Sequence, residues 1–243
     1  MISMVDETQG KISPISRHKK LPSPVGICRM ESAGYLLTDS QLEKIFIYRE
    51  QDNRLGILNE NLVLKRPTGI CFLAARGEIW VVETLLHRIT ILNKAGEMLR
   101  TIGKRGTAAG EFNFPTHIWA DKSGTVYVVD AMNFRVQIFS AEGEYLSSFG
   151  QPGDASGYFA RPRGIATDSF GNIYVVDALF HAVQIFDAKG NYLSHFGEQG
   201  REAGQFWLPA GIYIDENNYV YVADSFNGRI QVFQLVRGGP GEN

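Results

Sequence analysis

The chain has 243 residues, of which 44% are hydrophobic and 12% aromatic, and it contains 26 glycines. This composition is typical of one compact domain with many turns rather than of a helical bundle. The formal net charge of −2 differs from the strongly basic balance of most dedicated nucleic-acid modules. No apolar run approaches the roughly 18 residues of a membrane span, so we expect no membrane insertion. The N-terminus as given lacks a signal peptide, so the cytoplasm is the default compartment, with export if an upstream signal is missing.

The first 20 residues contain two strand-like segments, at 2–5 and 11–16. Residues 2–12 can be aligned with residues 185–192, as the third and fourth strands of an earlier repeat. Either residues 11–16 supply the missing outer strand of the last repeat and close a ring, or residues 1–20 are part of an earlier blade whose other strands lay upstream. We favour the second interpretation, because residues 2–5 have no role in the first.

Between residues 21 and 235 the chain repeats a short motif: a proline, one further residue, a glycine or histidine, and an isoleucine. The five copies are 24–27, 67–70, 115–118, 162–165 and 209–212. The prolines are about 43 to 48 residues apart. A period of this size, built from strand-like segments, indicates a propeller or another repeat array.

The third copy shows the order of elements within a unit. Its apolar runs are 117–120, 126–129, 136–139 and 145–149. Short runs rich in Val, Ile, Tyr and Phe, bounded by Gly and Asp turns, are typical of strands. We therefore predict one four-stranded antiparallel blade per unit. The fifth unit ends at Leu235 without a fourth strand, and residues 236–243 are expected to form a flexible tail.

Three linkers between units place a phenylalanine three residues before the proline, namely Phe112, Phe159 and Phe206. A single four-stranded sheet cannot bury both of its faces, so neighbouring blades must stack. We predict that each phenylalanine is a wedge between two blades, contributing about 1.5–3 kcal/mol by burial.

Four segments resemble a known family. They are Arg-Pro-Arg-Gly-Ile-Ala (161–166), Gly-Asn-Ile-Tyr-Val-Val-Asp (171–177), Phe-Asp-Ala-Lys-Gly-Asn-Tyr-Leu (186–193) and Asn-Gly-Arg-Ile-Gln-Val-Phe (227–233). Over about residues 21–234 the chain resembles the NHL-repeat β-propellers. The resemblance implies an all-β propeller with five full repeats and a partial N-terminal one, six-bladed in its complete form. It also implies a platform for protein or RNA, or less often a zinc-dependent lyase.

Strand order predicts which loops share a side of the molecule. The loops from the second to the third strand emerge beside the linkers that enter each proline, and we call this side the loop face. The hairpin turns emerge on the opposite side, the turn face. The loop face includes the basic segment 17–20. Our candidate binding residues on it are Arg66, His87, Arg105, His117, Asn133, Arg161, Arg163, Asp177, His181 and Asn227.

The second strand of every unit ends in an acid, and in four units a base follows five residues later. The acids are Asp39, Glu83, Asp130, Asp177 and Asp224, and the bases are Lys44, Arg88, Arg135 and Arg229. This spacing predicts ion pairs or acid-to-backbone bonds that hold the intervening loop. The fourth unit has Ala182 where a base would stand, so Asp177 either pairs across blades or is available to a ligand.

Rigid scaffolds with exposed loops are suited to recognition. We therefore predict a monomeric, non-catalytic scaffold that binds a protein or peptide through the loop face and uses no cofactor. The alternative is single-stranded RNA, with basic residues contacting phosphates and Phe134 or Phe180 stacking on bases. The mildly acidic composition disfavours that alternative.

A zinc-dependent lyase of the amidating type would need histidines converging from different blades. His87, His117 and His181 come from three consecutive units. However, Phe134 and Gly228 fill the position of His87 and His181 in other units, and His117 replaces the glycine of the repeat. We therefore expect neither a metal site nor a catalytic one.

Overall fold

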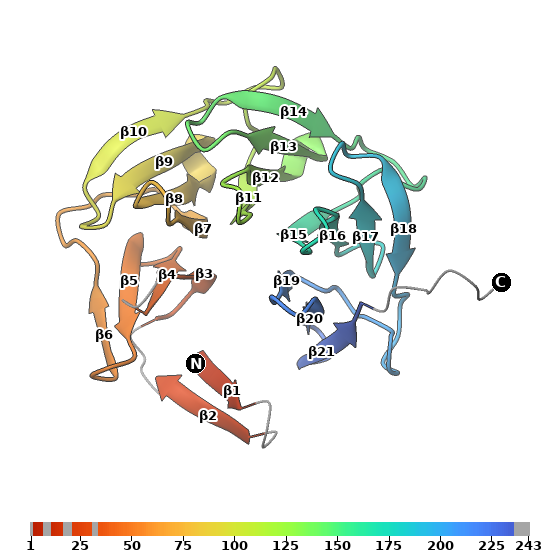
Figure 1. The fold of residues 1–243 in the computed structure, drawn as a ribbon, viewed down its shortest axis with the longest axis horizontal. Helices are drawn as coiled ribbons and strands as arrows, with labels where there is room; N and C mark the ends of the chain where they lie inside the picture. The colour runs from red at the N-terminus through yellow and green to blue at the C-terminus, as the bar shows by residue number, and fades with distance from the viewer. Residues whose placement is uncertain (1, 7–10, 17–20, 31–33, 236–243) are drawn as a thin grey trace. The chain divides into compact units, whose positions relative to one another are not determined.

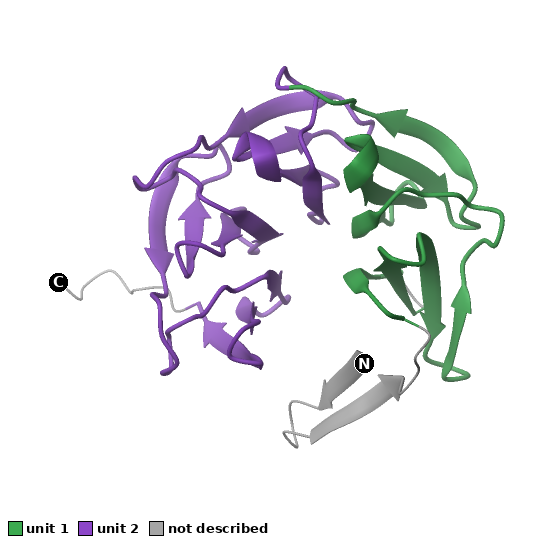
Figure 2. Ribbon diagram, turned by 180° about the vertical axis from the view of Figure 1, so that it is seen from behind, with its two compact units in different colours: residues 1–106 green, residues 107–243 purple. Residues whose placement is uncertain are grey.

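The computed structural model describes residues 2–6, 11–16, 21–30 and 34–235, which form β-strands joined by turns (Figure 1). The basic segment 17–20 and the expected C-terminal tail 236–243 lie outside the described residues. The chain divides into two compact units, residues 1–106 and residues 107–243 (Figure 2).

Unit 1 contains two four-stranded antiparallel sheets within its described residues. Blade I consists of β3 (Pro24–Arg29), β4 (Tyr35–Asp39), β5 (Lys44–Arg49) and β6 (Arg54–Ile57). Blade II consists of β7 (Pro67–Leu73), β8 (Glu78–Glu83), β9 (Arg88–Asn93) and β10 (Met98–Ile102). A short 3-10 helix, Thr84–Leu86, lies between β8 and β9.

Unit 2 continues the same pattern with three further sheets in its described part. Blade III consists of β11 (Pro115–Ala120), β12 (Val126–Asp130), β13 (Arg135–Phe139) and β14 (Tyr145–Phe149), with a 3-10 helix at Ala131–Asn133. Blade IV consists of β15 (Pro162–Thr167), β16 (Ile173–Asp177), β17 (Ala182–Phe186) and β18 (Tyr192–Phe196). Blade V consists of β19 (Gly211–Ile214), β20 (Tyr219–Asp224) and β21 (Arg229–Gln234).

The N-terminal segment forms a two-stranded antiparallel sheet of β1 (Ile2–Asp6) and β2 (Lys11–Ser16). Both strand-like segments predicted there are therefore strands. In the described residues β2 pairs with β1, and β21 is the last strand of its sheet. The fold is an all-β propeller of four-stranded antiparallel blades, as the repeat predicts.

Strand register explains why the repeat proline and the acid recur together. In blade IV, Pro162 lies opposite Asp177, and Asp177 lies opposite Ala182 on the next strand. Blade III has the same register, with Pro115 opposite Asp130. The acid therefore ends the second strand at the point where the linker enters the first, so one carboxylate can reach both the linker and the loop.

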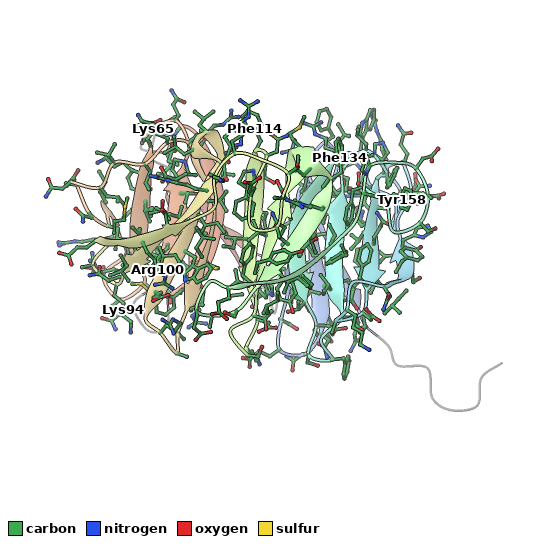
Figure 3. The ribbon with its side chains drawn as sticks, turned by 90° about the horizontal axis from the view of Figure 1, so that it is seen from above. Lys65, Lys94, Arg100, Phe114, Phe134 and Tyr158 are labelled. Carbon is green, nitrogen blue, oxygen red and sulfur yellow. The ribbon has the colours of Figure 1, made fainter. Side chains whose placement is uncertain are left out.

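Linkers and loops lie on the same side of each blade, as strand order predicts. In blade IV the N–H of Ala178 donates to the carbonyl of Arg161 at 3.0 Å, and in blade II the N–H of Thr84 donates to the carbonyl of Arg66 at 3.3 Å. In unit 2, Phe114 of a linker and Phe134 of a loop lie along one edge (Figure 3). The loop face is thus a real surface within each unit.

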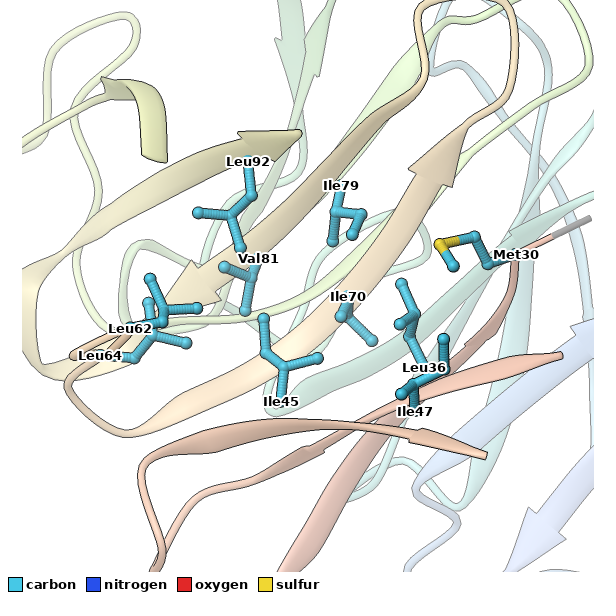
Figure 4. Packing of buried hydrophobic residues seen from close by; sticks show 10 residues of the cluster. All are labelled: Met30, Leu36, Ile45, Ile47, Leu62, Leu64, Ile70, Ile79, Val81 and Leu92. Atoms are coloured by element: carbon cyan, nitrogen blue, oxygen red, sulfur yellow. The ribbon is translucent and has the colours of Figure 1, made fainter. Parts of the chain in front are cut away.

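The core of unit 1 lies between its two blades. Buried side chains from both sheets and from the segments next to their strands pack together there: Met30, Leu36, Ile45, Ile47, Leu62, Leu64, Ile70, Ile79, Val81 and Leu92 (Figure 4). Within the strands, pairs such as Ile45 and Ile47 or Ile79 and Val81 are two residues apart and so point to the same face of their sheet. Stacking of neighbouring blades therefore supplies the burial that one sheet could not.

In unit 2 the linker phenylalanines complete the inter-blade layers. Phe159 is fully buried, with its ring centre 6.3 Å from that of Phe149 in blade III and 5.6 Å from that of Phe186 in blade IV. Phe206 is equally buried and contacts Phe196 of blade IV and Phe233 of blade V, at 6.1 and 5.8 Å. The predicted wedge is confirmed at these two positions.

Phe112 is also fully buried, and its ring centre lies 5.8 Å from that of Phe139 in blade III. Burying an aromatic ring of this size stabilises the fold by about 1.5–3 kcal/mol. The three linkers are therefore anchored by their aromatic side chains as well as by hydrogen bonds.

Candidate functional site on the loop face

The acid and the base of blade III form a clamp on the preceding linker. The carboxylate of Asp130 accepts from Arg135 Nε at 2.8 Å and from the N–H of Asn113 at 2.6 Å. The guanidinium of Arg135 also donates to the carbonyls of Ala108 and Glu111, both at 2.9 Å. The predicted ion pair is confirmed, and it fixes the linker to the loop.

Blades II and V use the same clamp. Glu83 accepts from Arg88 Nε and from the N–H of Lys65, at 2.8 and 2.7 Å. Asp224 accepts from Arg229 Nε at 2.8 Å. In blade I the base acts differently: Lys44 Nζ donates to the carbonyls of Glu60 and Leu62, and the backbone N–H groups of Ser23, Gln41 and Leu42 bind Asp39.

Glutamines two residues farther along the third strand add a second linker contact that sequence reasoning missed. In blade III, Gln137 Oε1 accepts from the N–H of Gly110 at 2.9 Å, and its Nε2 donates to the carbonyl of Glu111 at 2.7 Å. Gln184 and Gln231 bind the equivalent linker residues of blades IV and V. Their recurrence at one repeat position was the signal that could have revealed them.

Asp177 is bound by its own backbone surroundings. Its side chain is fully buried, and its oxygens accept from the N–H groups of Ala160, Arg161, Leu179 and Phe180, at 2.8 to 3.3 Å. The sequence suggested a partner in another blade or a free carboxylate, and the structure shows neither. Backbone donors replace the missing base, so Asp177 is not open to a ligand.

The other candidate residues differ in exposure. Arg66, Arg105 and Arg161 are exposed, whereas His87 is buried. The remaining candidates are partly exposed: His117, Asn133, Arg163, His181 and Asn227. His87 and Asp177 therefore do not line the surface as the sequence analysis expected, and the other eight are accessible at least in part.

Two of the partly exposed histidines have defined states. His117, on β11, is exposed only in part, and the withdrawal of its imidazole from water lowers its pKa to about 4, so the ring is neutral at physiological pH. His181 Nδ1 accepts from the N–H of Leu208 at 3.1 Å, which places the proton of the neutral ring on Nε2. His181 thereby joins the loop of blade IV to the linker of blade V.

The two asparagines serve the clamps. Asn133 Nδ2 donates to Asp130 at 2.8 Å, and Asn227 Nδ2 donates to Asp224 at 2.9 Å. Asn227 also donates to the carbonyl of Gly200. Their amides hold loops in place, which is a structural role rather than one in recognition.

A row of exposed apolar side chains on unit 2 was not predicted. Met132, Leu179 and Phe226 each stand two residues after the buried acid of blades III, IV and V, and they are 54%, 52% and 69% exposed. We call these three residues the apolar row. The recurrence of a large apolar residue two residues after the acid was visible in the sequence and could have revealed the row.

An aromatic stack extends the apolar row at blade V. The rings of Trp207 and Phe226 lie 6.3 Å apart at an interplanar angle of 22°, and the guanidinium of Arg201 lies 5.1 Å from the centre of the Trp207 ring. Trp207 occupies the repeat position held by Asn113 and Ala160. The stack is therefore a feature of one blade, added to a surface that all three blades share.

Among the described residues, no three His, Cys, Asp or Glu side chains lie where they could hold a metal ion together. The described part of the chain also contains no helix of the length and apolar character needed to cross a membrane.

A family described as "6-bladed beta-propeller" (DUF5128) matches residues 58–162 and 164–240. The chain belongs to this family. The family description agrees with the blade architecture and gives six blades, where the described residues form five. No curated protein matches the chain in sequence.

Solved structures share the propeller fold. An auxiliary nutrient binding protein from Bacteroides ovatus has a TM-score of 0.74 and 11% identity, covering 95% of this chain and 63% of that one. Virginiamycin B lyase from Staphylococcus aureus has a TM-score of 0.64 and 15% identity, covering 97% and 78%. A Nidogen/Laminin complex contains a chain with a TM-score of 0.58 and 22% identity, covering 76% and 67%. At these identities the likeness shows the fold alone.

Proposed function

We propose that this 6-bladed beta-propeller is a non-catalytic scaffold that binds a protein or peptide through the loop face of unit 2. The observation that carries the proposal is the apolar row of Met132, Leu179 and Phe226. Exposed apolar side chains scattered singly are ordinary, but recurrence at one loop position in three successive blades makes a surface suited to a partner.

The polar residues of the same loops support this assignment by being otherwise engaged. The acids and arginines of blades III and V hold their linkers, and Asp177 is closed by backbone donors. What these loops offer to another molecule is therefore mainly apolar and aromatic. Tryptophan, arginine and aromatic side chains dominate the energetics of protein interfaces, and the stack of Arg201, Trp207 and Phe226 provides all of these.

The proposed binding role agrees with what some similar propellers are named for. The NHL-type repeats, which the sequence resembles, are commonly interaction platforms, and one structural neighbour is titled an auxiliary nutrient binding protein. Another neighbour is titled a lyase, so fold alone does not choose between binding and catalysis.

The test is affinity capture with the tagged chain, with and without nuclease, on wild type and two matched triple variants. The first variant changes Met132, Leu179 and Phe226 to serine. The second changes three other exposed apolar residues of unit 2, Leu146, Phe170 and Leu193, which are 55%, 47% and 52% exposed. All three proteins should give the same circular dichroism spectrum.

The proposal predicts a nuclease-resistant partner, identified by mass spectrometry, that is retained by the second variant and lost with the first. Retention by both variants would contradict the location of the site. Recovery of nuclease-sensitive RNA would contradict the assignment of a protein partner, and turnover of a substrate by the purified chain would contradict the non-catalytic role.

A further inference from the structure

Two cations of blade IV have no counterion among the described residues. Arg161 is the last residue before the repeat proline, and Arg163 is the second residue of β15. In the part of the chain that the structure describes, neither guanidinium forms an ion pair or a hydrogen bond. The arginines of the neighbouring clamps, Arg135 and Arg229, are both paired with acids at 2.8 Å.

The nearby carboxylate of Asp177 does not serve as that counterion. Its oxygens are occupied by four backbone N–H donors, one of which belongs to Arg161 itself. Blade IV therefore has Ala182 where the other blades have a clamp base, and the side chains of Arg161 and Arg163 form no ion pair with any described residue.

Arg163 is poorly solvated where it stands. It is only partly exposed, and its pKa is lowered, first by burial and then by the neighbouring charge of Arg161. Two like charges held close together, one of them partly removed from water, raise the free energy of the unbound protein. A bound anion would relieve both costs, and a planar guanidinium pairs best with a carboxylate or a phosphate.

The surroundings of the two arginines favour a carboxylate that has apolar side chains next to it. The backbone N–H of Ala178 donates to the Arg161 carbonyl at 3.0 Å, so the loop that carries the exposed Leu179 is joined to the linker that carries Arg161. In the neutral ring of His181 the Nε2–H is a further donor from the same loop. An acidic residue bound by the arginines would therefore have apolar neighbours that could contact the apolar row.

A nucleic-acid backbone fits this surface less well. A protein that binds the phosphates of a nucleic-acid strand uses a series of Lys and Arg side chains along it. On the loop face of the described part of unit 2, the arginines outside the clamps are Arg161, Arg163 and Arg201, and the last lies over the Trp207 ring. Lys122 and Lys189 lie in hairpin turns of the turn face.

We propose that Arg161 and Arg163 form a carboxylate-binding site that makes the loop face specific for an acidic segment of the partner, with an Asp or Glu next to large apolar residues. This inference rests on the proposed function and adds the chemical class of the ligand.

The test is selection of short random peptides displayed on phage against the full chain, followed by fluorescence anisotropy of the synthesised winners. We expect sequences in which Asp or Glu adjoins Leu, Ile, Met or Phe. Changing Arg161 and Arg163 to glutamine together should weaken their binding about tenfold or more, the loss expected for a charge-assisted pair. The matched control changes Lys122 and Lys189 to glutamine and should leave the affinity unchanged.

Two further readouts keep the two proposals distinguishable. Because neither arginine pairs with an acid in the described part of the chain, the double variant should unfold at the wild-type temperature or above. Apolar winners without acids, bound equally by wild type and the arginine variant, would overturn the carboxylate site while keeping the scaffold. Winners that bind the serine variant of the apolar row unchanged would overturn the proposed surface itself. Tighter, arginine-dependent binding of single-stranded oligouridylate would overturn the acidic-peptide assignment in favour of RNA.

Discussion

The main-chain N–H of Arg161 donates to both carboxylate oxygens of Asp177, at 3.0 and 3.1 Å, although their side chains form no ion pair. The acid of the repeat therefore acts first as an acceptor for the backbone of the linker that enters its blade. The arginine of blades III and V strengthens this arrangement without being essential to it. This explains how blade IV keeps the same fold with Ala182 in place of a base.

Replacing Asp177 by asparagine should destabilise the chain. Asparagine offers one acceptor oxygen where Asp177 serves four N–H donors, and buried donors without acceptors cost about 1–3 kcal/mol. Urea unfolding followed by fluorescence measures the loss. The control is Asp154→Asn, at an exposed position, which should change the free energy of unfolding by less than about 0.5 kcal/mol. Equal stability of both variants would contradict the acceptor role.

Replacing Phe159 by alanine should cost about 3–5 kcal/mol, because it empties the space between blades III and IV. Phe170 is 47% exposed in a turn, so Phe170→Ala should cost less than about 1 kcal/mol. Thermal unfolding of both variants gives the comparison. Similar losses for the two would show that the linker phenylalanine is not a wedge.

Alanine substitutions at two glycines of blade IV should distinguish the cost of backbone strain from that of a steric clash. Gly190 and Gly171 have nearly equal positive φ angles, +83° and +85°. A methyl group at Gly190 would approach the Phe149 side chain to 2.6 Å, whereas one at Gly171 meets no atom within 4 Å. Gly171→Ala should therefore cost about 1 kcal/mol from the left-handed backbone alone. Gly190→Ala should cost clearly more, and equal denaturation midpoints would argue against this packing.

Stability should fall in mild acid because of His117. Burial lowers its pKa from 6.5 to about 4, so between these pH values the unfolded chain binds a proton that the folded chain does not. The contribution is complete above pH 6.5 and is lost as the pH falls towards 4, by about 1–3 kcal/mol. Between pH 6.5 and 4 the free energy of unfolding of a His117→Gln variant should therefore fall by about 1–3 kcal/mol less than that of the wild type. Parallel pH profiles for the two proteins would refute the assignment.

The sequence was most informative where a residue has a role that repeats with the blade. Patterns local to one blade were enough to predict the strands, the linker phenylalanines and the pairing of Asp130 with Arg135. The partners of Asp177 could not be foreseen in the same way, because backbone N–H groups leave no mark in the side-chain pattern.

Features that depend on tertiary placement were also missed. The stack of Trp207 and Phe226 joins a linker to a loop whose positions hold other residues in blades III and IV. The burial of His87 likewise depends on how its loop folds back. There the backbone N–H of His87 donates to the carbonyl of Thr84. The repeat thus revealed the blade architecture, whereas the aromatic stack is found where a single blade departs from the repeat.

The most direct test of the central claim is hydrogen–deuterium exchange of the full chain with and without the captured partner. Our account predicts protection of backbone amides in the loops 131–134, 178–181 and 225–228. It predicts none in the hairpin turns 121–124, 168–171 and 215–218 of the same unit. Protection confined to those turns, or absent from the loops, would contradict a binding site on the loop face.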